Sequence, residues 1–325
     1  MNRRMIILAA TLALVAPWSA PALSQAAYPS QPVIWVVPFP PGGAMDVMAR
    51  ALGGELAQAL GQPFVIENKP GAGGNIGLSE VARAEADGHT IVIVANGMAV
   101  NPYLYTEPGY DPVEDFEPVV MVGVVPNVLV ANPQYNSAET VEEVIAQAKK
   151  APGEMSVGSA GIGTSIHLAS ELFQSLTGTE FLHVPYRGSG PAIPDILGGR
   201  IDYMFDSVTS AQPHIASGAL RAIAVTTPQR SAALPDVPTI AEAGVPGYEL
   251  IPWFGVFTPD GTPPETIAVL NEAINEALAS PQVLERFAAI GAEPIGGTPE
   301  ELRDHLRHEI NVWGVLVPER GIRAE

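Results

Sequence analysis

The chain has 325 residues, 47% of them hydrophobic and 16% charged, which is the composition of a folded protein of about two domains rather than of a disordered chain. Its formal charge of -19 comes with no basic patch, and this excludes a general nucleic-acid binder, because such a charge repels phosphate backbones. The absence of cysteine excludes a disulfide framework, a thiol nucleophile and a thiolate metal site.

Residues 1–26 predict a secretory signal peptide that is removed on export. A pair of arginines precedes an apolar run at residues 5–16, and small and helix-breaking residues follow it. As a helix, this run would rise roughly 18 Å at about 1.5 Å per residue, well short of a hydrocarbon core of about 30 Å. We therefore expect cleavage after Ser24 or Ala26 and export to the periplasm or the cell exterior; an N-terminal core helix is the alternative.

After the leader, apolar runs of strand length alternate with stretches of helical period. The first series predicts strands at Val33–Val37, 64–66 and Thr90–Ala95, with helices at Ala44–Leu60 and 74–84. The second series predicts strands at 156–158, 181–184, 201–205 and 222–226, with helices at 164–176, 192–197 and 211–217. This β-α-β pattern indicates an α/β fold with two parallel-sheet domains and right-handed crossovers.

Two apolar stretches, at residues 119–130 and 250–257, have no helical partner in this scheme, and we interpret them as strands that cross a hinge between the domains. The remaining pattern is helical, at 264–280, 281–290 and 298–316, and it begins its last helix with a predicted capping box of Thr298 and Glu301. The predicted organisation is a signal peptide at 1–26, a discontinuous first domain at 27–125 and 252–325, and an inserted second domain at 126–251.

Two glycine-rich strand-to-helix turns carry the functional signal, VVPFPPGGAMD at residues 36–46 and VGSAGIGTSIH at residues 157–167. Glycine allows close approach of a ligand, and the first N–H groups of a helix have no partner within it, so each turn is a candidate anion site. Two such turns facing each other would hold a carboxylate at each end of a small molecule. Neither turn completes G-x-G-x-x-G, and no G-x-x-x-x-G-K-[ST] occurs, so the motifs do not favour a nucleotide.

Six motifs follow one another along the chain after the leader. They are VVPFPPGG, ENKPGAGGNIG, YDPVEDFEPV, VGSAGIGTSIH, HVPYRGSGPAIPDILGGRIDYMFD and GYELIPWFGVFTP. In order and spacing the chain resembles the Bug proteins, the periplasmic substrate-binding components of tripartite tricarboxylate transporters. The resemblance implies a two-domain periplasmic-binding-protein fold, or Venus flytrap, that closes on a small carboxylate and delivers it to membrane transporter subunits. It also implies a monomer that needs no cofactor, no metal and no nucleic acid.

The resemblance also implies ligand contacts in both turns and in the segments around them. These are Phe39, Gly42, Gly43, Ala44, Asp46, Asn96, Ser159, Gly163, Thr164, His167, Tyr186, Arg187, Asp206 and Trp253. One departure concerns Ala44 and Met45, which stand where the family commonly has hydroxyl residues. Because the methyl and the thioether lower the polarity of the first turn, we expect a carboxylate with an apolar or aromatic body rather than a citrate-like polyanion.

Structural roles compete with ligand roles at several of these positions. Asp46 suits the positive start of its helix, His167 could brace its turn, and Arg187 could form a surface salt bridge. Met98 and Trp253 suit a hydrophobic core as well as a pocket.

Two other functions remain as alternatives to a binding protein. A secreted hydrolase could use Ser159 or Ser165 with His167, but no G-x-S-x-G elbow is present, and Ser165 and His167 are two residues apart on a helix, where side chains do not face each other. An adaptor that reports the bound ligand to a membrane receptor would need the same closing cleft. The sequence favours binding without catalysis.

Overall fold

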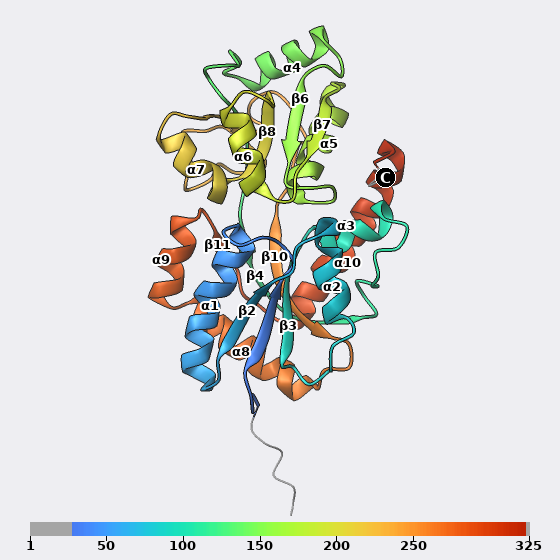
Figure 1. Cartoon of the computed structure of the whole chain (residues 1–325), viewed down its shortest axis with the longest axis vertical. Helices are drawn as coiled ribbons and strands as arrows, with labels where there is room; N and C mark the ends of the chain where they lie inside the picture. Colours follow the sequence, from blue (N-terminus) through green and yellow to red (C-terminus); the bar gives the residue numbers. More distant parts are fainter. Residues whose placement is uncertain (1–27, 323–325) are drawn as a thin grey trace, which may run out of the picture.

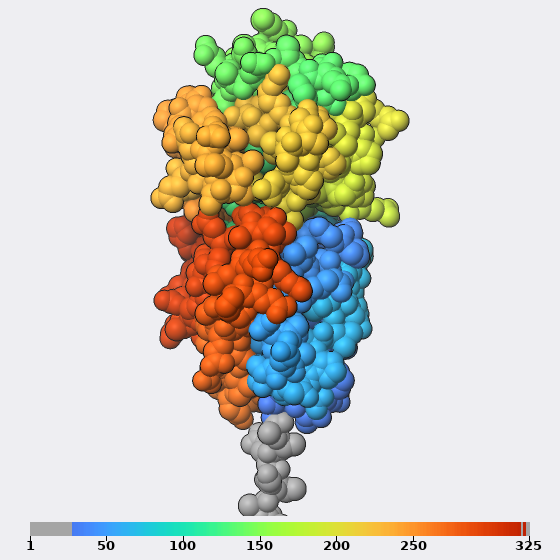
Figure 2. Space-filling view, turned by 90° about the vertical axis from the view of Figure 1, so that its left-hand side faces the viewer, coloured from blue at the N-terminus to red at the C-terminus, as the bar shows by residue number. Residues whose placement is uncertain are grey.

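The computed structural model describes residues 28–322, so the predicted signal peptide lies outside the described residues. The chain forms two β-sheets, one above the other along the long axis, with helices packed around each (Figure 1). In the space-filling view the two parts meet directly at a waist (Figure 2). No helix within residues 28–322 is long and apolar enough to span a bilayer.

The first sheet has the strand order β11-β4-β10-β3-β1-β2. Its strands are β1 (Val33–Val37), β2 (Phe64–Asn68), β3 (Thr90–Ala95), β4 (Phe116–Val124), β10 (Trp253–Pro259) and β11 (Glu293–Pro294). β1 pairs parallel with β2 and β3, whereas β10 runs antiparallel between β3 and β4. Its helices are α1 (Ala44–Leu60), η1 (Ala72–Gly74), α2 (Asn75–Val81), α3 (Gly97–Leu104), α8 (Pro264–Leu278), α9 (Pro281–Ala289) and α10 (Pro299–Arg320).

Side chains of β1 show how the first sheet is covered on both faces. Val33, Trp35 and Val37 belong to one buried cluster together with side chains of α1, α8 and α9. Val36 points the other way and joins a second cluster with side chains of α2, α3 and α10. This alternation follows from the two-residue period of a strand, and it explains the continuous apolar run.

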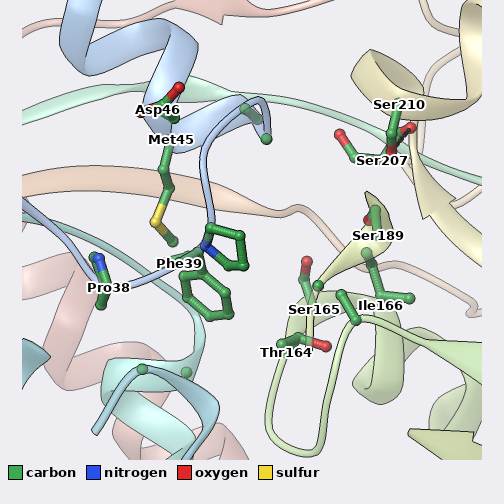
Figure 3. A pocket seen from close by; sticks show the side chains of 18 of the residues that line it. Pro38, Phe39, Met45, Asp46, Thr164, Ser165, Ile166, Ser189, Ser207 and Ser210 are labelled. Atoms are coloured by element: carbon green, nitrogen blue, oxygen red, sulfur yellow. Dashed lines mark hydrogen bonds between the residues drawn. The ribbon is translucent and has the colours of Figure 1, made fainter. Parts of the chain in front are cut away.

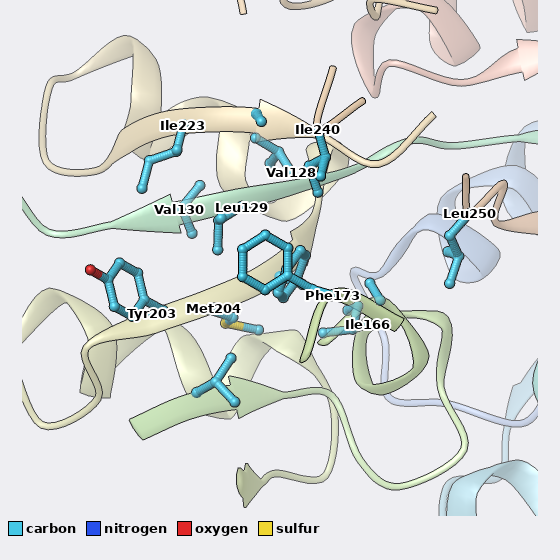
Figure 4. Close-up of a cluster of buried hydrophobic side chains, with 14 of the residues drawn as sticks. Val128, Leu129, Val130, Ile166, Phe173, Tyr203, Met204, Ile223, Ile240 and Leu250 are labelled. Atoms are coloured by element: carbon cyan, nitrogen blue, oxygen red, sulfur yellow. The ribbon is translucent and has the colours of Figure 1, made fainter. Parts of the chain in front are cut away.

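The second sheet has the order β7-β6-β8-β5-β9. Its strands are β5 (Asn127–Ala131), β6 (Ser156–Ser159), β7 (Leu182–Pro185), β8 (Tyr203–Ser207) and β9 (Arg221–Val225), and its helices are α4 (Val141–Lys150), α5 (Ser165–Thr177), α6 (Ser189–Leu197) and α7 (Val208–Ala216). β6 pairs parallel with β7 and β8, and β5 runs antiparallel to β8 and β9. Its core packs Val128, Leu129 and Val130 of β5 with Phe173 of α5 and Tyr203 of β8 (Figure 4).

The chain passes between the sheets twice, in adjacent segments. The link from β4 to β5 includes Val125, whose N–H donates to Pro252 O at 3.2 Å in the returning segment. Leu250 N donates to Thr226 O at 3.0 Å, and this bond attaches the start of the returning segment to the second sheet, just after β9. Both crossings fall in the apolar stretches that the sequence leaves without a helical partner.

The α/β class and the two-sheet architecture predicted from the sequence are confirmed, and so is the capping box, in which Glu301 N donates to Thr298 Oγ1 at 3.2 Å. The expectation of parallel sheets is wrong in one respect, because both sheets are mixed: β4, β5 and β10, which lie next to the crossings, run antiparallel to neighbouring strands. The domain limits at residues 126 and 251 remain a prediction.

Candidate functional site

A cavity of about 390 Å³ lies between the two sheets. The first domain contributes the turn after β1, the starts of α2 and α3, and Phe254 of β10. The second domain contributes the turns that follow β6, β7 and β8. The lining residues that carry polar side chains are Asp46, Asn127, Thr164, Ser165, Ser189, Ser207 and Ser210.

Besides α2 and α3, four helices begin at the wall of this cavity. Their N-caps are Gly43 for α1, Thr164 for α5, Gly188 for α6 and Ser207 for α7. This convergence follows from the parallel strands, because each of β1, β6, β7 and β8 ends at the cavity and is followed there by the start of a helix. Helix N-termini present unpaired N–H groups and a positive end, so the site attracts anions although the whole chain is acidic.

Asp46 holds the first turn in place from within. Its Oδ2 accepts from Gly42 N at 3.0 Å, and its Oδ1 accepts from Asn68 Nδ2 and Arg50 Nε, each at 3.0 Å. Asn68 Nδ2 also donates to Phe39 O at 3.0 Å, which ties the turn to β2. Burial opposes ionisation of the carboxyl, but these hydrogen bonds and the Arg50 charge together lower the pKa of Asp46. The carboxylate therefore braces the turn.

The second turn is braced by two stacked histidines. His167 and His183 have ring centroids 4.4 Å apart, and His167 Nδ1 accepts from Gly163 N at 3.3 Å. His183 Nε2 lies 2.7 Å from Oγ of the fully buried Ser159, which in turn accepts from Gly161 N at 3.2 Å. Burial and the neighbouring His183 lower the pKa of His167 to about 3. Burial lowers the pKa of His183 to about 4. Both rings are neutral at pH 7 and hold the turn.

The two domains touch on both sides of the cavity. On one side, a Cβ built on Gly73 would lie 2.7 Å from Ile162 O of the second turn. On the other side, a Cβ built on Gly188 would lie 3.4 Å from Pro40 Cγ. In a third contact, Thr209 Oγ1 at the start of α7 donates to Ile290 O, just after α9, at 2.8 Å. Through these contacts the two domains meet around the cavity.

Some of the predicted site residues line the cavity, some lie in or behind its wall, and others lie elsewhere. The lining includes Phe39, Gly42, Gly43, Ala44, Asp46 and Thr164. Ser159, Gly163, His167 and Asp206 lie outside the lining, in or behind the second-domain turns. Tyr186 donates its hydroxyl to Asp195 Oδ2 at 2.7 Å, and Arg187 is exposed and outside the lining.

Asn96 and Trp253 line a different groove, beside α10. Asn96 Nδ2 donates to Glu309 Oε2 at 3.0 Å, and the Nε1 atoms of Trp253 and Trp313 donate to the same oxygen, each at 3.1 Å. These contacts join α10 to the hinge segment and to the start of α3. Whether either residue contacts a ligand stays a prediction.

Sequence reasoning missed the serines of the second-domain wall, Ser189, Ser207 and Ser210, and it missed Asn127. A usable signal was present for Ser189 and Ser207, because each stands close after a predicted strand at the edge where helices begin. Opposite them lie the apolar side chains of Phe39 and Met45 (Figure 3), and Met98 and Phe254 also line the cavity. Within residues 28–322 the lining contains no lysine, arginine or histidine. An anion bound here would be held by backbone N–H groups and hydroxyls.

The same residues 28–322 hold no cluster of three His, Asp or Glu side chains suited to a metal ion. Ser159 is fully buried against His183, and the hydroxyl oxygen of Ser165 accepts from Asn127 Nδ2 at 3.3 Å. No histidine of the described chain therefore meets a serine at the cavity surface.

Residues 48–322 match the family model described as the tripartite tricarboxylate transporter family receptor. The chain is 43% identical to the protein BugT of Bordetella pertussis over 321 residues, which cover 98% of this chain and 97% of BugT. The structure of the periplasmic binding protein BugD is 37% identical, has a TM-score of 0.86, and covers 91% of this chain and 99% of its own. The structure of Rpa4515 from R. palustris with adipate is 39% identical, has a TM-score of 0.87, and covers the same shares of the two chains.

Proposed function

Because this chain belongs to the tripartite tricarboxylate transporter family of receptors, we propose that it captures a small carboxylate between its two domains and delivers it to membrane transporter subunits. The observation that carries the proposal is the convergence of four helix N-termini on one cavity that has no cationic side chain in its described lining. The structure of a relative with adipate supports a carboxylate as the ligand.

Energetics explain why both domains are needed. Each helix terminus contributes roughly 0.3 to 2 kcal/mol, and each hydrogen bond to a charged group contributes about 1.5 to 3 kcal/mol. A micromolar affinity requires about 8 kcal/mol net of the cost of association. The α1 terminus alone falls short of this, whereas α1 and α5 acting together with hydroxyl donors reach it. Tight binding therefore requires the closed arrangement.

The ligand body lies against the apolar wall of the first domain. Met45 and Met98 are flexible and polarizable, and Phe39 and Phe254 offer flat surfaces, so this wall favours an alkyl chain or an aromatic ring. A further carboxylate on the ligand would find no cationic side chain in the described lining of the cavity. We therefore place a carboxylate with an apolar or aromatic body ahead of a citrate-like ligand.

Binding without turnover is part of the proposal. The hydrolase alternative needs a serine and a histidine at the cavity, and the described lining offers Thr164 and serines without a histidine. A sensing adaptor would use the same closing cavity, and we place transport first because of the family. We further propose that the mature protein is a periplasmic monomer, as the periplasmic relative BugD supports for the location.

Calorimetry and thermal-shift measurements with succinate, adipate, benzoate and citrate test the proposal. We expect at least one of them to bind with about micromolar affinity, to raise the melting temperature and to be recovered unchanged. Small-angle scattering with that ligand should show compaction, because a ligand that prefers the closed form shifts the population toward it. No binding by a broader carboxylate panel would reject the proposal, and consumption of the ligand over many turnovers would favour an enzyme.

A further inference from the structure

A groove of about 970 Å³ lies along α10, and we call it the hinge groove. Its walls are one face of α10, the end of β4, residues 247–251 of the returning segment and residues 295–297. Trp253 lines this groove, whereas its neighbour Phe254 lines the first cavity, because successive residues of a strand point to opposite faces. The hinge groove is therefore a separate cavity, on the other face of β10.

Hydrogen bonds hold the walls of the hinge groove in place. Gly296 N donates to Met121 O at 2.9 Å, which attaches one wall to β4. On the opposite wall, Glu309 Oε2 accepts the three N–H groups described above, and these bonds join α10 to the hinge segment and to the start of α3. A ligand would therefore find this groove already formed and would not have to order its walls.

Much of the lining of the hinge groove is apolar, and part of it is exposed. Ile251 is 38% exposed and Ile295 is 57% exposed, although both are large aliphatic side chains. Val312, Trp313 and Leu316 continue the apolar surface along α10. Exposed apolar side chains gathered in a cavity are typical of a surface that a ligand removes from water.

Carboxylates gather in the hinge groove without basic side chains. Glu249, Glu301 and Glu309 line it, and within residues 28–322 its lining contains no lysine or arginine. All three donors to Glu309 go to Oε2, so Oε1 accepts no hydrogen bond from the described residues. The groove thus repels an anion and attracts a cation.

His305 provides a further observation. Its ring packs edge-on against that of Trp253, with centroids 5.0 Å apart, and its Nε2 is buried without a hydrogen-bond partner within the described residues. Burial lowers the pKa of His305, although the Glu309 charge favours protonation, so the ring is neutral at pH 8. Buried polar nitrogens usually have a partner, and a neutral imidazole can accept from an N–H group. A ligand N–H group in the groove would supply the partner that the protein lacks.

We propose that the hinge groove is a second binding site, which takes an organic ammonium ion with an aromatic body. The ammonium group donates to Glu309 Oε1, and the ring packs against Trp313 and Ile251. Tryptophan rings also attract an ammonium ion through their π-faces. The volume suits such a molecule, because sites for small ligands measure about 300 to 1,000 Å³.

Calorimetry at pH 8 with tryptamine and its neutral analogue tryptophol tests the proposal. Both probes carry an indole ring on a two-carbon chain, which ends in an ammonium group in tryptamine and in a hydroxyl in tryptophol. We expect tryptamine to bind with a Kd of about 0.1 mM, and tryptophol to bind about fivefold more weakly. Raising the ionic strength from about 0.05 to 0.3 M should reduce this difference, because salt screens the carboxylates.

Lysine substitutions locate the bound probe. Ile295→Lys places a cation and a longer side chain in the hinge groove at an exposed position, and it should weaken tryptamine binding by about tenfold or more. Ile251→Lys is a second groove variant with the same expectation. Gly190→Lys introduces a lysine into the first cavity, where a Cβ meets nothing within 4 Å, and Leu284→Lys introduces one on α9, outside both cavities. Both of these controls should bind tryptamine as wild type does.

Each outcome bears on the proposal. Failure of wild type to bind tryptamine overturns the site, and equal affinities for the two probes overturn recognition of the ammonium group. Binding that is lost in Gly190→Lys and kept in both groove variants places the probe in the first cavity and also overturns the proposal. None of these measurements uses a carboxylate ligand, so this inference and the proposed function fail separately.

Discussion

Gly163 and Asn101 are packed so closely across the two domains that a Cβ on Gly163 would lie 2.1 Å from Asn101 Oδ1. Asn101 is fixed by its own Nδ2, which donates to Gly73 O at 3.1 Å and to Asn75 Oδ1 at 2.6 Å. Gly163 also has a φ of 82°, a conformation that suits glycine. The contact between the second turn and α3 therefore depends on a residue without a side chain.

We expect Gly163→Ala to weaken ligand binding by about tenfold, because the added methyl would clash with α3 in the closed arrangement. Calorimetry with the wild-type ligand measures the effect. The matched control is Gly218→Ala, at a φ of 74° with nothing within 4 Å of its Cβ, which adds the backbone strain without the contact. Equal affinities of the two variants would show that the contact does not limit closure.

The double variant Ala44→Ser with Met45→Thr should raise affinity for succinate relative to benzoate. Both residues line the cavity at the start of α1, and two hydroxyls would restore polar groups there. The expected change in the ratio corresponds to about 0.5 to 1.5 kcal/mol, the net value of a hydrogen bond. Ala57→Ser, on the same helix but outside the cavity lining, is the control for calorimetry. An unchanged ratio would mean that positions 44 and 45 do not face the ligand.

Glu309→Ala should lower the free energy of unfolding by about 2 to 4 kcal/mol, because three buried or half-buried N–H groups lose their shared acceptor. Glu309→Gln keeps a side-chain oxygen and should lose less. Urea denaturation measures both, and Asp304→Ala, an exposed change on the same helix, controls for helix propensity. If Glu309→Ala lowers the free energy of unfolding by no more than Asp304→Ala does, Glu309 does not stabilise the contacts between α10 and the hinge segment.

The ionisation of Asp206 should lower the free energy of unfolding as the pH rises. Burial raises its pKa to about 6 from 3.8, although Ser189 and the His214 charge favour ionisation, so the native state holds the proton more tightly than the unfolded state. Stability is therefore lost as pH rises from about 4 to 6, by up to about 3 kcal/mol. Asp206→Asn should gain stability relative to wild type over that range in urea denaturation.

The quantity to compare is the difference in the free energy of unfolding between wild type and Asp206→Asn. His167 and His183 have pKa values lowered to about 3 and 4, so their contribution is lost as pH falls below about 6.5, with the opposite sign. Both proteins share this contribution, and it cancels. A constant difference between pH 4 and 7 would contradict the raised pKa of Asp206.

Export should leave a mature protein that begins near Gln25 or Ala27. The reason is the short apolar run of residues 5–16 behind a pair of arginines. Mass spectrometry of a periplasmic extract measures the mature terminus. An intact Met1 in the membrane fraction would contradict cleavage.

Much of the fold was predictable because local signals agree with tertiary packing. Val33–Val37 is an apolar run that ends in proline and glycine, and both β1 and α1 have the predicted bounds. α4 was not predicted, although Thr140 and Glu143 form a capping box at its start. α3 contains Pro102, which obscures its helical pattern. The antiparallel strands could not be foreseen from the sequence, because their direction is set by where the chain crosses between sheets.

The site was predictable to the level of its turns and not to that of its side chains. Phe39, Gly43 and Thr164 line the cavity as part of the turns themselves. His167 stacks on His183 of β7, and Asn96 meets Glu309, which is 213 residues away. Such partners come together only through tertiary structure. The same holds for Ser189 and Ser207: the sequence shows that each follows a strand, but only the structure shows that both line one cavity.

The position of β10 has a consequence for the order in which the chain folds. β10 lies between β3 and β4 in the first sheet, so the native sheet cannot form until residues 253–259 are available. The second sheet needs only residues 127–225. Contacts so distant in sequence slow folding. The N-terminal half of the chain therefore cannot complete its sheet while the rest is still being synthesised.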